Sequence, residues 1–407
     1  MVKTYQYRIY PTKAQTQTLE TQLDACRNIY NQALAWRKNT YEQKGGSGSY
    51  VQQANALTPL RGGSTFWSSL HSDVLQDTLR RLDQGFKAFF RRIKAGENRG
   101  YPRFKGQGRY RSMTFSHLAK TLIRGIGGRM ARLVVPKMGE VKICYHRPLP
   151  NGNIKTLTVQ RKASGWYANI TVEVDDVPKA AIETAVGVDV GLESFLTTSE
   201  GEKVGNPRHL RRAELKLKRK QRIVSRRKKT SHRRRKFVHE LAKQHEHVAN
   251  QRKDFHGKTA HRLYSEYDAV VVEDLQITNM VKNHHLAKSI SDAAWGTFIS
   301  TLASKAENAG LHLLCVPPHG TSQICSGCGE IVKKSLSVRV HRCNSCGLTL
   351  DRDHNAAINI LKRAASALRG GVLEVISPEK LSLERKKREI HDDVGDFTSP
   401  RALAVGG

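Results

Sequence analysis

Three acidic residues at the ends of predicted secondary-structure elements constrain the fold of this chain most strongly. Asp189 lies within Val-Gly-Val-Asp-Val-Gly, Glu273 ends the apolar run Asp-Ala-Val-Val-Val-Glu, and Asp353 opens the helical pattern Asp-His-Asn-Ala-Ala-Ile. Buried carboxylates repel one another unless a cation lies between them. A central-strand Asp, a neighbouring strand-end Glu and a helix-start Asp can reach one point from three directions. We therefore interpret the three residues as ligands of a divalent metal site.

Each acid also has a simpler interpretation. Asp189 could cap a turn, Glu273 could merely end a strand, and Asp353 could be a helix N-cap together with Asp351. The order Asp, Glu, Asp along the chain is that of an RNase H-like nuclease domain, which favours a shared metal site. We expect Asp353 rather than Asp351 to be the ligand, because it stands four residues before Ala357 and shares the helix face that should contact the sheet.

The charge of the chain indicates a polyanionic partner. Lys and Arg number 69 against 36 Asp and Glu, which gives a net charge of +33, and such a balance is typical of nucleic-acid-binding proteins. A membrane-surface protein is the alternative, but residues 1–10 do not form a signal peptide and no apolar run approaches the ~18 residues of a spanning helix. We expect a cytoplasmic, nucleoid-associated bacterial protein with no membrane partner. The acids then predict a metal-dependent nuclease.

The first half of the chain changes its hydrophobic period twice. An alternating pattern in residues 5–9 predicts an opening strand. Within residues 11–100 the apolar residues recur at helical spacing, and after Tyr101 apolar and polar residues alternate again, as in strands. The simplest topology is an antiparallel β-barrel formed by residues 1–10 and 101–180, with residues 11–100 inserted as a helical domain.

The second half has a different organisation. The strand that bears the first acid is followed by two further strands, which is typical of an RNase H-type sheet. Two long basic helical patterns come next, then the second acidic strand, a helix expected from about Asp292 to Gly310, and another strand. These elements predict an α/β nuclease domain formed by residues 181–316 and 350–370. Residues 377–407 are charged without a sustained apolar stripe, so we expect them to be disordered.

Two Cys-x-x-Cys pairs predict a zinc ribbon in residues 317–349. The ligands would be Cys325, Cys328, Cys343 and Cys346. Two thiolates separated by two residues can bind one ion, and four of them close a tetrahedral shell. Two disulfides are the alternative, which a reducing compartment disfavours. Because a closed shell leaves no position for water, this zinc would be structural.

A dense basic run follows the nuclease hairpin. Residues 208–236 carry sixteen Lys or Arg against one acid, Glu214. A solvated helix face is the simpler interpretation of such a run, but this density is self-repulsive without a polyanion. We expect the side chains of Arg226, Arg227, Lys228 and Lys229 to contact nucleic-acid phosphates, which position the partner without reading its sequence.

Several motifs in order resemble those of the TnpB family, transposon-encoded RNA-guided nucleases related to type V CRISPR effectors. They are Gly-Val-Asp-Val-Gly, Val-Val-Glu-Asp-Leu, Ser289-Ile-Ser-Asp-Ala-Ala-Trp, Thr321-Ser-Gln-Ile-Cys-Ser-Gly-Cys-Gly, Asp351-Arg-Asp-His-Asn-Ala-Ala and Tyr101-Pro-Arg-Phe-Lys. The similarity runs from the first strand to about Leu368. It implies that the barrel is a wedge domain, the inserted helices a recognition domain, and the remainder a RuvC-like nuclease interrupted by a zinc-bearing target-nucleic-acid-binding module.

The resemblance also implies partners and site residues. Family members bind a guide RNA from the transposon end, recognise a short motif beside the target, and cut double-stranded DNA with Mg²⁺. Asp189, Glu273 and Asp353 occupy the catalytic motif positions unaltered. The positions where relatives contact the flanking duplex correspond to Tyr50, Gln76 and Ser116, and the segment 289–295 resembles a lid whose Ser291 or Asp292 could equally be a helix N-cap.

Two other classes of function share many of these features. A guide-directed DNA-binding repressor would have the same charge and cysteines, but it would not need the three acids. An RNA-independent DNA-binding zinc-ribbon protein is the second alternative, and the sequence leaves it open.

Overall fold

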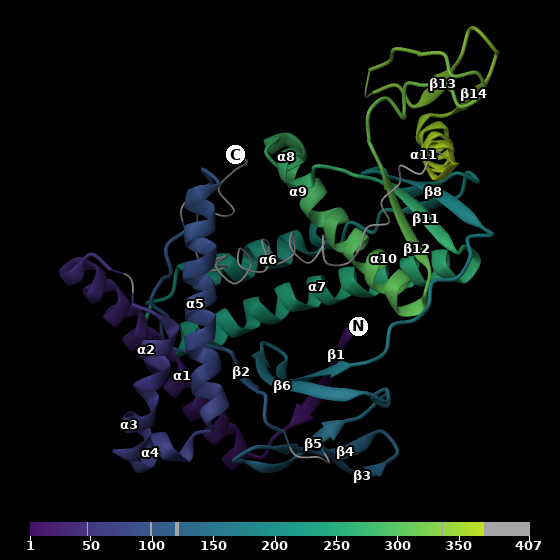
Figure 1. Cartoon of the computed structure of the whole chain (residues 1–407). Helices are drawn as coiled ribbons and strands as arrows, with labels where there is room; N and C mark the ends of the chain where they lie inside the picture. Colours follow the sequence, from purple (N-terminus) through teal and green to yellow (C-terminus); the bar gives the residue numbers. More distant parts are fainter. Residues whose placement is uncertain (47, 98–99, 119–121, 336, 370–407) are drawn as a thin grey trace. The chain divides into compact units, whose positions relative to one another are not determined.

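The computed structural model describes residues 1–46, 48–97, 100–118, 122–335 and 337–369 (Figure 1). The chain divides into two compact units, one formed by residues 1–176 and the other by the residues from 177 onward. The tail expected to be disordered, residues 377–407, lies outside the described residues. No helix in the described part of the chain combines the length and the apolarity needed to cross a membrane.

The first unit contains one antiparallel seven-stranded sheet, in the order β2-β6-β7-β1-β5-β4-β3. Its strands are β1 (Val2–Tyr10), β2 (Ser112–Phe115), β3 (Ile123–Gly127), β4 (Met130–Val135), β5 (Gly139–Cys144), β6 (Asn153–Lys162) and β7 (Gly165–Glu173). The opening strand pairs with β7 and β5, so it joins the later strands as the sequence predicts. Among the described residues no ladder connects β2 to β3, and closure into a barrel stays a prediction.

Five helices pack with this sheet in one continuous apolar core. They are α1 (Lys13–Lys44), α2 (Tyr50–Asn55), α3 (Leu57–Gly62), α4 (Thr65–Ser69) and α5 (Ser72–Lys94). A capping box starts α1, because Thr12 and Gln15 satisfy each other's backbone N–H groups. Most apolar residues with the expected helical spacing are buried, for example Leu23 and Leu82, whereas Ile93 near the end of α5 is exposed. The separate domain boundaries predicted at residues 11 and 100 stay predictions.

The second unit is built on a mixed five-stranded sheet, in the order β10-β9-β8-β11-β12. Its strands are β8 (Ala185–Val190), β9 (Ser194–Thr198), β10 (Lys203–Gly205), β11 (Ala269–Glu273) and β12 (His312–Val316). The first three form antiparallel pairs, and β8, β11 and β12 are parallel. The predicted opening, in which the strand of Asp189 is followed by two further strands, is therefore present, and β11 and β12 extend the sheet in parallel.

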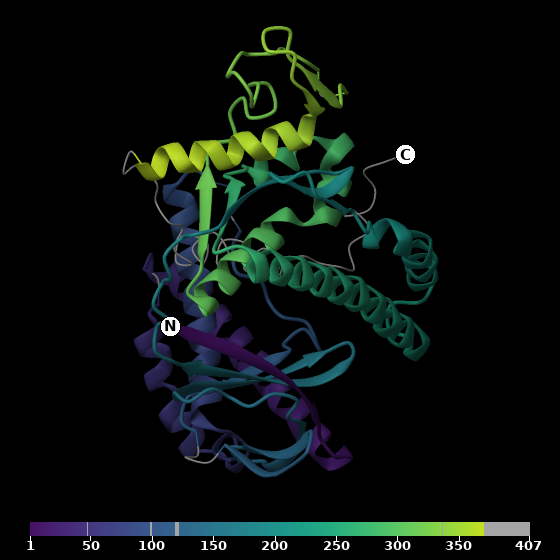
Figure 2. The same cartoon turned by 90° about the vertical axis from the view of Figure 1, so that its right-hand side faces the viewer.

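Helices cover both faces of this sheet. One face packs against α7 (His232–Glu266) and α10 (Trp295–Ala309), and the other against α11 (Arg352–Arg369), as Figure 2 shows. The basic helix α6 (His209–Ser225) packs along α7 through an apolar seam. Both basic helices match the sequence-based expectation.

We expected a helix from about Asp292 to Gly310, and the predicted start of this helix is wrong. The chain instead forms α8 (Ile277–Met280) and α9 (His284–Ala293), and α10 begins at Trp295. Ala294 between them has a φ of 52°, a left-handed conformation that interrupts the helical hydrogen bonding. Asp292 caps a different helix, because its carboxylate accepts the backbone N–H groups of Leu210 at 2.8 Å and Arg211 at 3.2 Å, at the start of α6.

Candidate functional site: three carboxylates at one end of the sheet

Two of the three acids lie side by side on one face of the sheet. The core shared with α10 includes Val186, Val188, Val270 and Val272, and the core beneath α11 includes Ala185, Ala269 and Val271. Because strand side chains alternate, Asp189 and Glu273 fall on the α11 face. Val188 pairs with Val272 across the parallel strands. The next residue on each strand is the acid, so both carboxylates stand at the carboxyl end of the sheet.

The first turn of α11 brings the third acid to the same place. Gly187 lets this helix approach β8, because a Cβ at that position would lie 2.2 Å from the carbonyl oxygen of Ala357. One turn earlier on α11, Asp353 directs its carboxylate toward the end of β8, where a Cβ on Gly191 would lie 4.0 Å from Oδ2. Asp351 is the helix cap, since its Oδ1 accepts the N–H groups of Asp353 at 3.0 Å and His354 at 3.2 Å.

The electrostatics of this site are unfavourable for three anions without a cation. Burial raises the pKa of Asp189 well above its ordinary value, and the carboxylates of Glu273 and Asp353 raise it further. Burial also raises the pKa of Glu273, while a hydrogen bond from the Thr321 hydroxyl acts in the opposite direction. Hard carboxylate oxygens that share a dehydrated position are the ligand set of a divalent cation.

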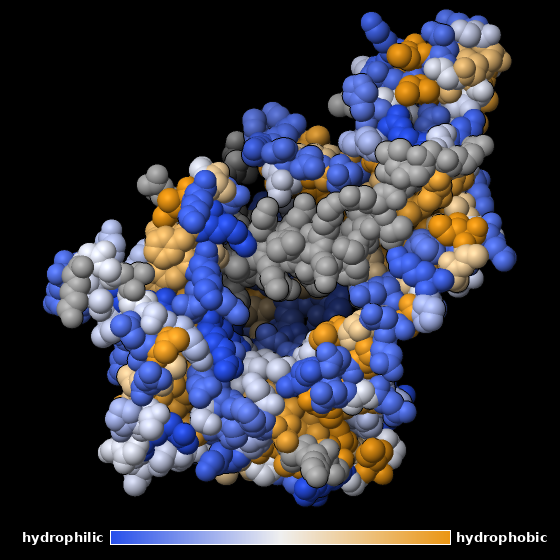
Figure 3. Space-filling view, in the orientation of Figure 1, coloured by the Kyte–Doolittle hydropathy of each residue, from blue (hydrophilic) through white to orange (hydrophobic). Residues whose placement is uncertain are grey.

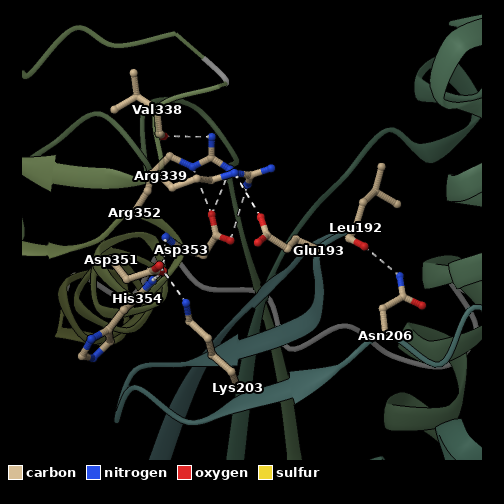
Figure 4. A network of polar contacts seen from close by, with 10 residues as sticks. All are labelled: Leu192, Glu193, Lys203, Asn206, Val338, Arg339, Asp351, Arg352, Asp353 and His354. Carbon is tan, nitrogen blue, oxygen red and sulfur yellow. Dashed lines mark hydrogen bonds and ion pairs between the residues drawn. The ribbon is translucent and has the colours of Figure 1, made fainter.

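Basic side chains that the sequence analysis missed surround the third acid (Figure 4). Arg352 donates to Oδ1 of Asp353 from Nε at 3.0 Å and from Nη2 at 2.9 Å. Arg339 lies 3.9 Å from Oδ2 of Asp353 and 3.2 Å from Glu193. The position of Arg352 between two aspartates is a local sequence signal of its contact with Asp353. The sequence around Arg339 gives no such signal of its contact with the same residue.

The three carboxylates are spread more widely than the cysteine ligands. Within the described residues, the group whose potential ligand atoms all lie within 4.8 Å of one another is the set of four cysteines. In the described structure, the three acids therefore do not all lie within this distance of one another.

The four predicted zinc ligands converge at the tip of the cysteine-rich segment. Their thiols are free, with Sγ–Sγ distances of 3.6 Å for Cys325–Cys346 and 3.5 Å for Cys328–Cys343. A disulfide would need about 2.05 Å, whereas a tetrahedral site with Zn–S bonds of about 2.3 Å places its sulfurs about 3.8 Å apart. The cluster is compatible with structural zinc, and the disulfide alternative does not hold.

Tight turns and α11 hold this cluster in place. Gly329 and Gly347, which each follow a Cys-x-x-Cys pair, have φ values of 83° and 71°, the left-handed conformation that such tight turns require. The short strands β13 (Val340–Arg342) and β14 (Thr349–Asp351) form the second part of the ribbon. On α11, Asn355 donates to the carbonyl of Ile324 at 2.8 Å and accepts the N–H of Ser326 at 2.9 Å.

The predicted phosphate contacts lie in the turn between α6 and α7. Arg226, Lys228 and Lys229 are exposed there. Arg227 is half-buried, with its guanidinium 5.2 Å from the ring centre of Phe237. Three of the four side chains are therefore free to reach a polyanion, and their role stays a prediction.

The predicted readers of the flanking duplex all lie in the first unit. Tyr50 begins α2 and is half-buried against the core. Gln76 lies on α5 and accepts from Arg80 at 3.3 Å. Ser116 is exposed, and its N–H donates to Asp73, three residues before Gln76, at 2.8 Å. The structure thus places Ser116 and Gln76 at the same end of α5, and their role is also still a prediction.

Full-length similarity to known proteins decides the family. A Streptomyces pristinaespiralis protein named "Putative RNA-guided DNA endonuclease" is 37% identical over 380 residues, which cover 91% of this chain and 92% of that protein. InsQ of Escherichia coli K12, with the same designation, is 28% identical over 91% of this chain and 94% of its own length. A mimivirus protein named "TnpB-like protein L79" is 32% identical over 30% of this chain.

The chain belongs to the TnpB family. Family models match three of its regions, described as "Helix-turn-helix domain" for residues 1–46, "Probable transposase" for residues 169–284 and "Cas12f1-like, TNB domain" for residues 295–360. In this TnpB protein the first region forms the strand β1 and the single 32-residue helix α1, which is not a pair of helices joined by a turn. The third region contains all four cysteines and Asp353.

A solved structure shares the fold of this TnpB protein. "Structure of the mini-RNA-guided endonuclease CRISPR-Cas_phi3" superposes with a TM-score of 0.51 at 10% identity, over 89% of this chain and 92% of that one. A chain of very different sequence therefore adopts the same fold.

Proposed function

We propose that this TnpB-family chain is an RNA-guided DNA endonuclease of a transposon that hydrolyses target DNA next to a short flanking motif. The observation that carries the proposal is the meeting of Asp189, Glu273 and Asp353 on one sheet face, at the carboxyl ends of β8 and β11. Full-length relatives bear the endonuclease designation. A DNA target also accounts for the net charge of +33.

Magnesium fits the acidic site. Two Mg²⁺ ions bound there would activate the attacking water and stabilise the leaving 3′-oxygen. Asp189, Glu273 and Asp353 would hold these ions, since burial and the carboxylates of Glu273 and Asp353 all raise the pKa of Asp189. Thr321 orients Glu273 through its hydroxyl, and Asp351 orients the start of α11 and hence Asp353.

The remaining assignments belong to the same proposal. The sheet and helices of the first unit would be the wedge barrel and the recognition domain, with Tyr50, Gln76 and Ser116 reading the flanking duplex. Residues 181–316 and 350–370 would be the RuvC-like nuclease, and the zinc ribbon of residues 317–349 the target-nucleic-acid-binding module. The protein would act in the bacterial cytoplasm at the nucleoid, where its DNA target lies.

A guide-directed repressor that does not cut DNA is the main alternative. It would keep the basic turn and the cysteines but would have no use for three buried, mutually repelling acids. Burial, and then the acidic neighbours, raise the pKa of Asp189, so holding this carboxylate ionised destabilises the metal-free protein and calls for a function. We therefore favour cleavage over binding alone.

The decisive experiment combines RNA sequencing with cleavage. RNA extracted from the purified protein should include the transposon end, and the complex should cut guide-matched DNA in the presence of Mg²⁺. Asp189→Ala, Glu273→Ala and Asp353→Ala should each reduce cleavage by at least about 100-fold, because each removes a metal ligand, while RNA binding persists. Asp274→Ala is the matched control, since Asp274 is an exposed acid next to Glu273. Normal cleavage by any of the three variants would remove that residue from the site.

A further inference from the structure

The motif Tyr101-Pro-Arg-Phe-Lys105 forms an irregular segment that is fixed at both ends. Its residues have no helix or strand assignment. The side chain of Asn31 on α1 donates to the carbonyl of Lys105 at 2.9 Å and accepts its N–H at 2.8 Å. Pro102 packs against α5, where a Cβ on Gly85 would lie 3.7 Å from its ring. The segment is therefore held in one conformation without regular secondary structure.

This aromatic segment, residues 101–105, presents its rings to solvent. Phe104 is 57% exposed and Tyr101 is 43% exposed. Tyr101 meets Phe86 and Phe89 of α5 edge to face, with ring centres 5.5 Å and 5.3 Å apart. Its ring is thus anchored from one side, whereas no ring contact involving Phe104 is recorded among the described residues. Two exposed rings on a segment that Asn31 and Pro102 hold in place form a surface on which a planar partner can stack.

The surroundings of the aromatic segment are mainly cationic. Residues 87–97 and 100–105 contain six Lys or Arg and one acid, Glu97. A second acid, Glu42, lies close enough to Tyr101 to add to the rise in the pKa of its hydroxyl that burial causes. Arg91, Lys94 and Arg103 are exposed. Figure 3 shows apolar residues beside the C-terminal half of α5, next to strongly hydrophilic ones. Exposed aromatics interleaved with cations are the pattern of single-stranded nucleic-acid binding, in which bases stack on rings and cations contact phosphates.

We propose that the aromatic segment binds unpaired bases of the guide RNA. Phe104 and Tyr101 stack on successive bases, and Arg103 between them contacts a phosphate. The inference rests on the proposed RNA-guided function and names the part of the first unit that takes up the RNA. Paired RNA is a poor ligand for this surface, because the faces of its bases are already stacked within the helix.

The test uses the full-length protein and a single-stranded guide RNA of the transposon end. Phe104→Ala should weaken binding by about 5- to 150-fold, the range expected for one base–aromatic stack. Phe104→Trp should retain the wild-type affinity, because it keeps a stacking surface. Phe66→Ala is the matched control, since Phe66 is a similarly exposed aromatic residue, at 44%, on α4 of the same unit. Ultraviolet crosslinking should join RNA to Phe104 or Tyr101.

A second variant separates stacking from charge. Arg103→Gln should lower the affinity and make the salt dependence shallower by about one phosphate contact, whereas Phe104→Ala should leave the salt slope unchanged. Wild-type affinity of Phe104→Ala, or equal loss of affinity for fully paired RNA, would overturn the inference while the proposed function stands. A wild-type protein that binds no RNA at all would overturn both.

Discussion

Arg352 donates two hydrogen bonds, at 3.0 and 2.9 Å, to a single oxygen of the adjacent Asp353 carboxylate. The positive charge of Arg352 also acts to lower the pKa of Asp189, against the burial and the acidic neighbours that raise it. The guanidinium thus partly supplies the positive charge that this acidic site needs. The second oxygen of Asp353 lies 3.9 Å from Arg339, farther than the first oxygen from Arg352, so we take it as the better-placed atom for a metal ion.

The first prediction concerns competition between Arg352 and metal. Arg352→Gln should increase the affinity for Mn²⁺ in the absence of nucleic acid by about fivefold, because removing a positive charge beside Asp353 removes its repulsion of the cation, an effect of about 1 kcal/mol. Titration calorimetry measures this directly. Lys203→Gln is a suitable control, since Lys203 pairs with Asp351 rather than with Asp353. Weaker Mn²⁺ binding by Arg352→Gln would mean that the arginine instead positions Asp353 for the metal.

The second prediction is a pH dependence of stability. The pKa of Asp189 is higher in the folded protein than in the unfolded chain, so the folded state binds the proton more tightly. The free energy of unfolding of the metal-free protein should therefore fall as pH rises from about 4 toward the raised pKa. Asp189→Asn should make this decline smaller, leaving the part due to Glu273, whose pKa burial also raises, and should raise the melting temperature at neutral pH.

Differential scanning fluorimetry of the metal-free protein over this pH range checks that expectation. Added Mg²⁺ should stabilise the wild type at neutral pH and affect Asp189→Asn much less. If the free energies of unfolding of the two proteins showed the same pH dependence, the ionisation of Asp189 would not be the cause of the decline.

The third prediction concerns the cysteine cluster. Cys325→Ser or Cys343→Ser should lower the bound zinc below one ion per chain and destabilise the ribbon, because an all-thiolate site couples metal binding to folding. Cys144→Ser should leave the zinc content unchanged, since Cys144 lies in β5 of the other unit. Elemental analysis of the purified proteins gives the stoichiometry. A well-folded wild type without zinc would contradict the assignment.

The fourth prediction concerns the turn between α6 and α7. Replacing Arg226, Lys228 and Lys229 together by Ala should weaken nucleic-acid binding with little dependence on sequence and reduce the salt slope by about two to three. Arg227 is left intact because its guanidinium packs over Phe237. Binding titrations at several salt concentrations give the slope, and an unchanged slope would place the phosphate contacts elsewhere.

The sequence alone determined the features that depend on local periodicity and spacing. The basic helices, the acids at the strand ends and the turns at Gly329 and Gly347 follow from patterns within a few residues. Even the pairing of β1 with later strands was predictable, because an isolated strand must find partners in a sheet.

Only the tertiary structure decided which distant groups meet. Asp292 looked like the cap of its own helix, yet it caps α6, whose Leu210 N–H is 82 residues away. Ala294 carries no helix-breaking signal, but the chain is interrupted there in a left-handed conformation. Arg339 reaches the acidic site because the ribbon folds back onto the start of α11. There the backbone carbonyl of Arg339 accepts the N–H of Arg352 at 2.8 Å. Such contacts depend on how folding places separate elements next to one another, and a pattern within a few residues carries no information about that placement.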